Sequence, residues 1–226
     1  MPVLHAHKLS FHLNDGRQLF NDITLTIDGG KTGLVGRNGI GKSVLADILA
    51  GQIAPYSGAV SVNGNVGYFN QISTDALTSK QTIAAFIGVE QKLNALDRIE
   101  QGHCRQQDFE IVGDDWQLRG EIASLLNSLQ LPPDPFRNCA DLSGGEQSRL
   151  ILWRLFKSNS ALLILDEPSN HLDTQARDWL VKQLLAFNGA IILISHDQQL
   201  LEHMNSIYEL SSLGLTRYDG NYTDYL

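Results

Sequence analysis

The sequence predicts an α/β fold with a mostly parallel sheet, an antiparallel β portion near the N-terminus and an inserted helical subdomain. Three observations lead to this prediction. The apolar runs ALLILD (161–166) and AIILIS (190–195) are typical of strands buried on both faces, and helical segments alternate with them. The alternation in DITLTID (22–28) indicates a half-buried strand. From about 72 to 135 the pattern is helical without strand alternation, which predicts the insert.

The other elements follow from the same rules in chain order. Residues 42–51 have helical spacing and end at a glycine that can cap a helix. In the insert, Asp114 or Asp115 is the predicted N-cap of the second helix, and LPPDPF (131–136) ends that helix. Further strands are predicted over 2–11, 32–36, 58–71 (a pair) and 206–218 (a pair), with helices over about 145–157 and 174–187 and a short one after 195. The core would comprise about 1–71 and 141–226, and the subdomain about 72–140.

Composition excludes several classes of function. The chain has 226 residues, with 17 Lys and Arg against 25 Asp and Glu, so its formal charge is −8 and direct nucleic-acid binding is not expected. Cys104 and Cys139 have no metal-site spacing and are expected to be reduced thiols. His5 and His7 share one strand face without a third ligand, so we interpret them as structural or surface residues. With no leader pattern and no span-length apolar run, a cytoplasmic protein is expected.

The segment GRNGIGKS (36–43) fits the phosphate-loop pattern G-x-x-x-x-G-K-[ST] between a strand and a helix. Gly39 and Gly41 let the backbone turn its N–H groups toward a phosphate, and the helix N-terminus adds positive potential. Lys42 is expected to reach the β- and γ-phosphates, and the Ser43 hydroxyl to coordinate Mg²⁺. A chance glycine-rich turn is the weaker interpretation.

Polar residues follow the buried strands at their carboxyl ends, where α/β sheets bind ligands. Asp166 is expected to reach the Mg²⁺ shell, and Glu167 to act as general base on a water. His196 is expected to donate to the γ-phosphate. Gln71, at the start of the insert, is expected to touch Mg²⁺ or the attacking water. The alternative interpretation is that Asp166 and Glu167 cap a helix, and we consider it the weaker one.

A second glycine loop, DLSGGEQSRL (141–150), precedes another predicted helix. Ser143, Gly144 and Gly145 have the chemistry of a phosphate site at a helix N-terminus. Because residues 36–43 with Asp166 and Glu167 already complete one site, the second loop is expected to serve the ATP of another domain or chain. The alternative is a structural turn that only caps the helix.

Together these segments resemble the ATP-binding cassette (ABC) ATPases over essentially the whole chain. The resemblance makes GRNGIGKS the Walker A motif, LSGGEQ (142–147) the signature, LLILDE (162–167) Walker B and SNHLD (169–173) the D-loop. It implies one RecA-like P-loop NTPase domain that binds ATP and Mg²⁺ and acts as an ATPase, weakly when isolated. The implied nucleotide-binding residues are Phe11, Gly36, Arg37, Asn38, Gly39, Ile40, Gly41, Lys42, Ser43, Val44 and Asp166, with Ser143, Gly144, Gly145 and Glu146 acting on a partner's ATP and Asp173 in the D-loop. The implied catalytic residues are Glu167, His196 and Gln71, and the Mg²⁺ ligands Ser43, Gln71 and Asp166.

Phe11 matches the aromatic residue that stacks on adenine in this family, and His12 is the second choice. A core aromatic on a strand is the alternative interpretation of Phe11.

Within the family, EPSNHLD (167–173) and the terminal YDGNYTDYL are similar to ABC-F proteins, which include ribosome-associated translation and resistance factors. Ser169 replaces the usual Thr and keeps the hydroxyl. The resemblance implies pairing head to tail with a second cassette, either in one parent chain or in a homodimer. We expect the chain to be a fragment of a two-cassette protein that acts on the ribosome through regions absent here. The alternative is the ATP-binding subunit of a membrane transporter.

Overall fold

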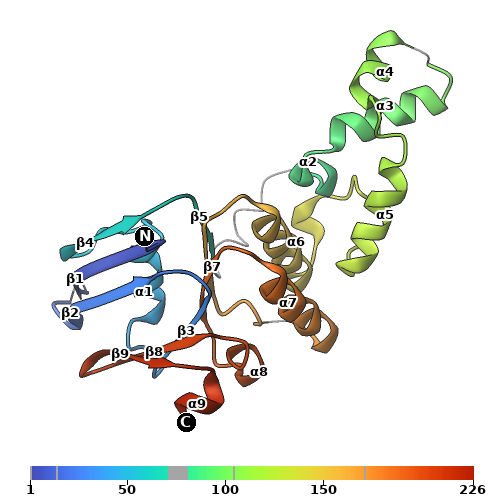
Figure 1. Ribbon diagram of the computed structural model, residues 1–226. Coiled ribbons are helices and arrows are strands. Elements are labelled where there is room, and N and C mark those ends of the chain that lie inside the picture. The colour runs from blue at the N-terminus through green and yellow to red at the C-terminus, as the bar shows by residue number, and fades with distance from the viewer. Residues whose placement is uncertain (1, 14, 71–80, 104, 171) are drawn as a thin grey trace. The chain divides into compact units, whose positions relative to one another are not determined.

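A six-stranded sheet forms the frame of the structure, in the order β5-β6-β7-β3-β8-β9 (Figure 1). The computed structural model describes residues 2–13, 15–70, 81–103, 105–170 and 172–226. The strands are β3 (Lys31–Val35), β5 (Val66–Phe69), β6 (Leu162–Asp166), β7 (Ala190–Ile194), β8 (Ser206–Ser211) and β9 (Gly214–Asp219). All neighbouring strands are parallel except the β8–β9 hairpin. Every residue of β6 and β7 is buried, as expected for strands covered on both faces.

A second, antiparallel sheet has the order β2-β1-β4, formed by β2 (Gln18–Ile27), β1 (Leu4–His12) and β4 (Ser57–Val62). Its inner face is apolar: the buried pairs Leu4–Ile27 and Ala6–Leu25 point to it, and the half-buried pair His5–Thr26 between them points away. Tyr208 of β8 joins the two sheets, since its hydroxyl donates to Thr26 O at 3.1 Å. The predicted α/β class with an antiparallel portion is therefore confirmed.

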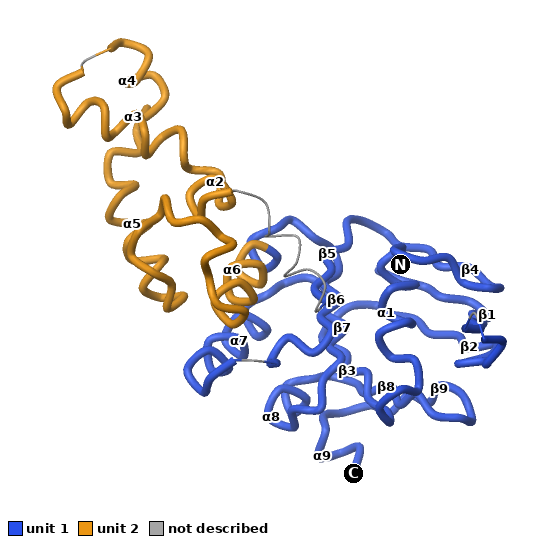
Figure 2. Tube along the Cα trace, turned by 180° about the vertical axis from the view of Figure 1, so that it is seen from behind, with its two compact units in different colours: residues 1–71, 155–226 blue, residues 72–154 orange. Residues whose placement is uncertain are grey.

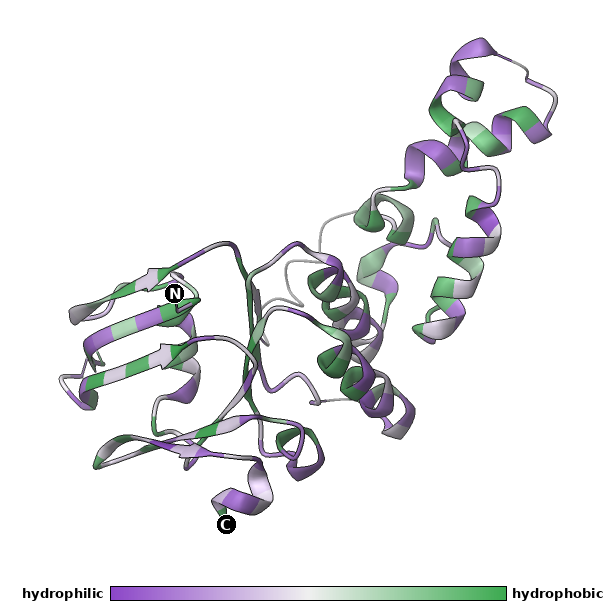
Figure 3. Cartoon of the chain, viewed as in Figure 1, coloured by the Kyte–Doolittle hydropathy of each residue, from purple (hydrophilic) through white to green (hydrophobic). Residues whose placement is uncertain are grey.

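Helix α1 (Lys42–Leu49) supplies the apolar contacts between the two sheets. Leu45, Ala46, Ile48 and Leu49 lie in one buried cluster with residues of β1, β2, β3, β6, β7 and β8. The first helical turn of α1 is thereby fixed at the carboxyl edge of the parallel strands. Figure 3 shows the corresponding apolar interior of the central sheet in green.

The remaining helices of this part of the chain are α7 (Thr174–Ala186), α8 (Gln198–Leu201) and α9 (Tyr222–Tyr225). Figures 1 and 2 show α7 and α8 on the face of the sheet opposite to α1. Helix α9 was not predicted from the sequence. It begins with a capping box, in which Asn221 and Asp224 each accept from the other's backbone N–H at 3.0 Å.

The chain forms two compact units, residues 1–71 with 155–226 and residues 72–154 (Figure 2). The second unit contains α2 (Ile83–Ile87), α3 (Glu90–Glu100), α4 (Gln106–Val112), α5 (Leu118–Ser128), a 3₁₀ turn (Cys139–Asp141) and most of α6 (Gly144–Lys157). Arg98 of α3 binds Asp108 of α4, with Nε at 2.9 Å from Oδ1, and the Arg98 guanidinium holds the pKa of that carboxyl below its usual value.

Two details of this unit differ from the sequence prediction. Helix α5 begins at Leu118 after Gln117, so neither Asp114 nor Asp115 caps it, and Asp115 instead forms an ion pair with Lys92. The unit also runs to 154, beyond the boundary expected near 140. The cause is that the start of α6 bonds within it: Arg149 Nη2 donates to Gln130 O at 3.1 Å. Among the described residues, no helix is long and apolar enough to cross a membrane.

Because the central strands carry the core, Leu193→Ala should destabilise the chain strongly. Leu193 has no exposed surface, so removing its side chain leaves a cavity that costs about 2–5 kcal/mol in the free energy of unfolding. Urea unfolding measures this change. Leu185→Ala is the matched control, because Leu185 is 53% exposed and its truncation should change the free energy by less than about 0.5 kcal/mol. Equal losses in both variants would contradict the buried position of Leu193.

Candidate nucleotide-binding site

The phosphate loop lies between β3 and α1 and depends on glycine. At Gly36, with φ 147°, a Cβ would lie 2.3 Å from Leu210 O, so no other residue fits there without a backbone shift. Gly41, with φ 112°, adopts a left-handed conformation directly before α1. The loop therefore approaches β8 closely and turns sharply into the helix.

The Lys42 side chain is buried and held by the loop itself. Its Nζ donates to Gly36 O at 2.8 Å and to Arg37 O at 3.3 Å. Burial lowers the pKa of the Lys42 ammonium, and the charges of Glu167 and Asp166 oppose that effect. Backbone carbonyls of the loop thus hold the Lys42 ammonium in place without a ligand.

Asp166 ends β6, and its carboxylate is nearly buried, with 6% of the residue exposed. Burial raises its pKa, while a hydrogen bond from Ser43 lowers it. Among the described residues, Asp166 Oδ1 has no hydrogen-bond partner, although it is fully buried. A buried carboxylate oxygen without a donor requires a ligand or water to satisfy it.

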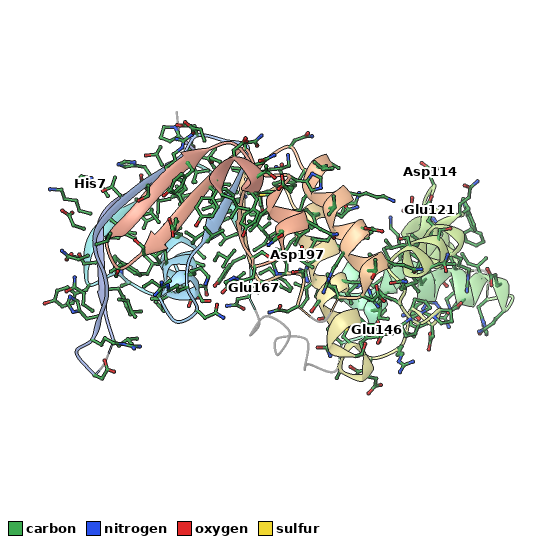
Figure 4. The ribbon with its side chains drawn as sticks, turned by 90° about the horizontal axis from the view of Figure 1, so that it is seen from below. His7, Asp114, Glu121, Glu146, Glu167 and Asp197 are labelled. Atoms are coloured by element: carbon green, nitrogen blue, oxygen red, sulfur yellow. The ribbon has the colours of Figure 1, made fainter. Side chains whose placement is uncertain are left out.

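Glu167 and His196 complete the group at the carboxyl edge of the sheet. Glu167, labelled in Figure 4, has a left-handed backbone with φ 50°, and its N–H donates to Ile194 O at 2.9 Å. Burial raises the pKa of its carboxyl, and nearby His196 lowers it. His196 Nε2 lies 3.5 Å from Glu167 Oε1 and 3.3 Å from Lys42 Nζ. The predicted residues Lys42, Asp166, Glu167 and His196 therefore converge, as sequence reasoning expected.

A cavity of about 370 Å³ opens beside these groups. It is lined by Leu13, Arg17, Leu19, Asn38, Gly39, Gly41, Lys42, Ser43, Val44, Asp166, Glu167 and Ile194. The lining combines loop backbone, a cation and carboxylates with aliphatic side chains and Arg17. This combination suits a ligand that carries both phosphate and an apolar ring. Gly36, Arg37 and Ile40 belong to the loop but not to this lining.

The residue expected to stack on adenine does not line this cavity. The Phe11 ring lies 6.3 Å from the Phe20 ring and packs against the core, and His12 lies edge-on to Tyr56 at 4.8 Å. Sequence reasoning missed Leu13, Arg17 and Leu19, which line the cavity. Their position on either side of the sequence NDG was the available signal, because Leu13 follows β1 directly and Arg17 directly precedes β2.

Mg²⁺ fits the oxygen donors on this edge. The orphaned Asp166 Oδ1 and the Ser43 hydroxyl are hard ligands of the kind Mg²⁺ prefers. The described part of the chain holds no cluster of three or more His, Cys, Asp or Glu that could bind a metal alone. The ion would therefore need phosphate oxygens and water as further ligands, which is usual for Mg²⁺ bound with a nucleotide. Gln71, the third predicted ligand, lies outside the described residues.

The signature loop lies in the second unit and forms a capping box at the start of α6. Ser143 N and Oγ both donate to Glu146 Oε2, at 2.7 and 2.8 Å, and Glu146 N donates to Ser143 Oγ at 3.4 Å. Gln147 donates to Cys139 O and Leu142 O, which fixes the loop in front of the helix. Within the described part of the chain, no atom lies within 4 Å of a Cβ built at Gly144, so the described residues leave the loop open at this point. Glu146 is labelled in Figure 4.

Asp173 of the predicted D-loop is the N-cap of α7, because its carboxylate accepts from Ala176 N at 2.8 Å. The loop before it is fixed by backbone bonds from Asn170 N to Glu167 O and from Leu172 N to Ser169 O. The contacts of Asp173 thus give it a structural role as a helix cap. A D-loop role would be a second function of the same residue.

Comparisons with known proteins agree with this geometry. The family described as ABC transporter matches residues 20–170, more than half of the chain. The energy-dependent translational throttle protein EttA of Mycobacterium tuberculosis is 31% identical over 92% of this chain and 40% of its own length. An antibiotic resistance protein of Mycobacteroides abscessus is 30% identical over 89% of this chain and 40% of its own length. A nucleotide-free ATP-binding cassette from an ABC transporter superposes with a TM-score of 0.68 at 16% identity, over 100% of this chain and 94% of that one.

The chain spans between 35% and 48% of the length of these curated relatives. The family match, residues 20–170, covers the phosphate loop, the signature loop and the acidic end of β6. The phosphate loop and the end of β6 also line the cavity. The chain belongs to the ABC transporter family, as an ATP-binding cassette of ABC-F-like sequence.

Proposed function

We propose that this cassette binds ATP with Mg²⁺ and hydrolyses its γ-phosphate. The convergence of Lys42, Asp166 and Glu167 on one cavity, with His196 Nε2 3.5 Å from Glu167 Oε1, carries the proposal. Lys42 and the loop N–H groups would neutralise the phosphates, and Ser43 and Asp166 would hold Mg²⁺, which supplies further charge neutralisation when bound. Glu167, with a pKa raised by burial, would take a proton from water, and His196 would donate to the γ-phosphate.

The proposal extends to a second cassette. The phosphate loop and the signature loop lie in different compact units, and Lys42, Asp166 and Glu167 already complete the first site. We propose that Ser143, Gly144 and Gly145 act on ATP bound to a partner cassette that meets this one head to tail, with Asp173 nearby. One chain would then supply halves of two sites, and hydrolysis by the isolated cassette would be weak because each half lacks its complement.

For the cellular role, we propose a protein of ABC-F type that acts on the ribosome. Support comes from the 31% identity to a protein named a translational throttle. The net charge of −8 does not favour RNA binding by this chain itself, so we propose that other regions of the protein make the RNA contacts. The complete gene product with Glu167→Gln should co-sediment with ribosomes in ATP and not in ADP. Absence from the ribosome pellet, with association to a membrane-spanning partner instead, would favour the ATP-binding subunit of a transporter.

Glu167→Gln should bind ATP and hydrolyse it at least about a hundredfold more slowly, because general-base catalysis is worth 10²–10⁴. Phosphate release and binding of a fluorescent ATP analogue measure the two properties. Lys42→Ala is the contrasting variant, since it should weaken nucleotide binding itself. Undiminished turnover by Glu167→Gln would remove Glu167 from the role of base.

Ser143→Arg should abolish ATP-driven pairing, because a bulky cation would occupy the loop that faces the partner's ATP. Light scattering on the Glu167→Gln background, with and without ATP, reports the dimer. Ser124→Arg adds the same charge to an exposed position of α5 and should leave pairing intact. If Ser143→Arg still pairs in ATP, the signature loop serves only as the helix cap that the Ser143–Glu146 box already shows.

Asp166→Asn should make the metal-free chain more stable at pH 7. Burial raises the folded-state pKa of Asp166 above its unfolded value, so the folded state binds the extra proton and loses stability as pH rises through the folded pKa. The variant lacks this charge and its penalty. Urea unfolding in EDTA should show the gain at pH 7 and a smaller gain toward pH 4, whereas Mg²⁺ with an ATP analogue should favour the wild type. A gain independent of pH would contradict a buried charge as its cause.

A further inference from the structure

A tyrosine–aspartate pair lies behind the proposed Mg²⁺ ligands. Tyr68 Oη, on β5, donates to Asp47 Oδ1, on α1, at 2.7 Å. Both residues are partly buried. Neither is among the residues that line the cavity described above. Burial raises the pKa of Tyr68 well above its usual value, and the Asp47 carboxylate contributes to this rise. The Tyr68 hydroxyl therefore keeps its proton and acts as a permanent donor to Asp47.

The helix places Asp47 beside the metal ligands. Asp47 is four residues after Ser43, so the two side chains share one face of α1. Ser43 and Asp166 both line the cavity described above, so this face of α1 points to the end of β6. The Asp47 charge also raises the pKa of Asp166, as a neighbouring anion must.

The sheet places Tyr68 on the same side. Tyr68 pairs with Ile164 in the parallel register of β5 and β6. Ile164 and Asp166 are two residues apart on β6, so their side chains and that of Tyr68 project from one face. The Tyr68–Asp47 bond thus joins α1 to β5, the strand next to the one that ends in Asp166.

We propose that Asp47, held by the Tyr68 hydroxyl, is a positioning residue of the Mg²⁺ site, whose carboxylate accepts hydrogen bonds from water bound to the ion. This inference rests on the proposed binding of Mg²⁺ with ATP. Mg²⁺ keeps several of its waters in protein sites, and each water hydrogen needs an acceptor. A carboxylate held by Tyr68 one helical turn from Ser43 can fill that need, and such partners commonly change metal affinity by 10–100-fold.

The alternative role of the pair is structural, in which the hydrogen bond only pins α1 to β5. Asp47→Asn separates the two roles. The amide oxygen can still accept from Tyr68, so the pin remains, whereas the charge and one water-accepting oxygen are lost. Tyr68→Phe makes the opposite change, because it keeps the ring and the Asp47 charge but removes the hydroxyl that orients the carboxylate.

The experiment measures Mn²⁺ binding by electron paramagnetic resonance of the free ion, with the purified chain and a non-hydrolysable ATP analogue. Asp47→Asn should weaken Mn²⁺ binding about tenfold, and Tyr68→Phe should weaken it by a smaller factor in the same direction. Affinity for the analogue in EDTA should stay within about twofold of wild type for both variants. Asp178→Asn removes the same charge from an exposed position of α7 and should leave both affinities unchanged.

Wild-type Mn²⁺ affinity in Asp47→Asn would overturn the inference and leave the proposed function standing. An equal fall of nucleotide affinity in EDTA would also overturn it, because a positioning role toward the ion does not affect metal-free binding. If the wild-type chain itself binds no Mn²⁺ with the analogue, the proposed Mg²⁺–ATP function fails, and this inference fails with it.

Discussion

The placement of the Lys42 ammonium is the constraint on which the rest of the nucleotide site depends. A buried cation needs acceptors close by, and the carbonyls of Gly36 and Arg37 supply them only because the loop bends back on itself. That bend in turn needs glycine where the loop meets β8. The charges of Asp166 and Glu167 then oppose the loss of the ammonium's proton. The Lys42 ammonium thus links the phosphate loop, the ends of the strands and the start of α1.

The parts of this arrangement that sequence could predict are those with strong local rules. The apolar runs of β6 and β7 specify buried strands, and such strands must end with their polar residues at one edge, so Asp166, Glu167 and His196 could be brought together without coordinates. The glycine pattern of the phosphate loop likewise has few alternative backbone solutions. These predictions hold because the apolar pattern of a strand and the backbone freedom of glycine can be recognised in the local sequence.

Other features depend on contacts that no local pattern encodes. Phe11 has the residue type expected for an adenine platform, yet it packs beside Phe20, because apolar burial is available there. Asp115 has the residue type of an N-cap but is paired with Lys92, which lies in a different helix. The pairing of Asp47 with Tyr68 joins residues 21 apart in sequence, and neither position has a pattern that marks it. Choices between equally good local partners are decided by the tertiary structure.

Division of the cassette into two units gives its two glycine loops different relations to their neighbours. The phosphate loop is enclosed by the sheet and by α1, whereas the signature loop ends in a helix cap whose own glutamate takes the serine donors. A partner's phosphate would compete with that carboxylate for the same groups, so head-to-tail pairing would begin from an already satisfied loop.

The backbone of Glu167 has a consequence for how this protein can change. A residue other than glycine at φ 50° stores strain of about 1 kcal/mol or more, which glycine would release. Selection for thermal stability alone would thus favour loss of the carboxylate at this position. Replacing Glu167 with glycine would release this strain and remove the carboxylate at the same time, so folding stability and the proposed general base make opposite demands on one position.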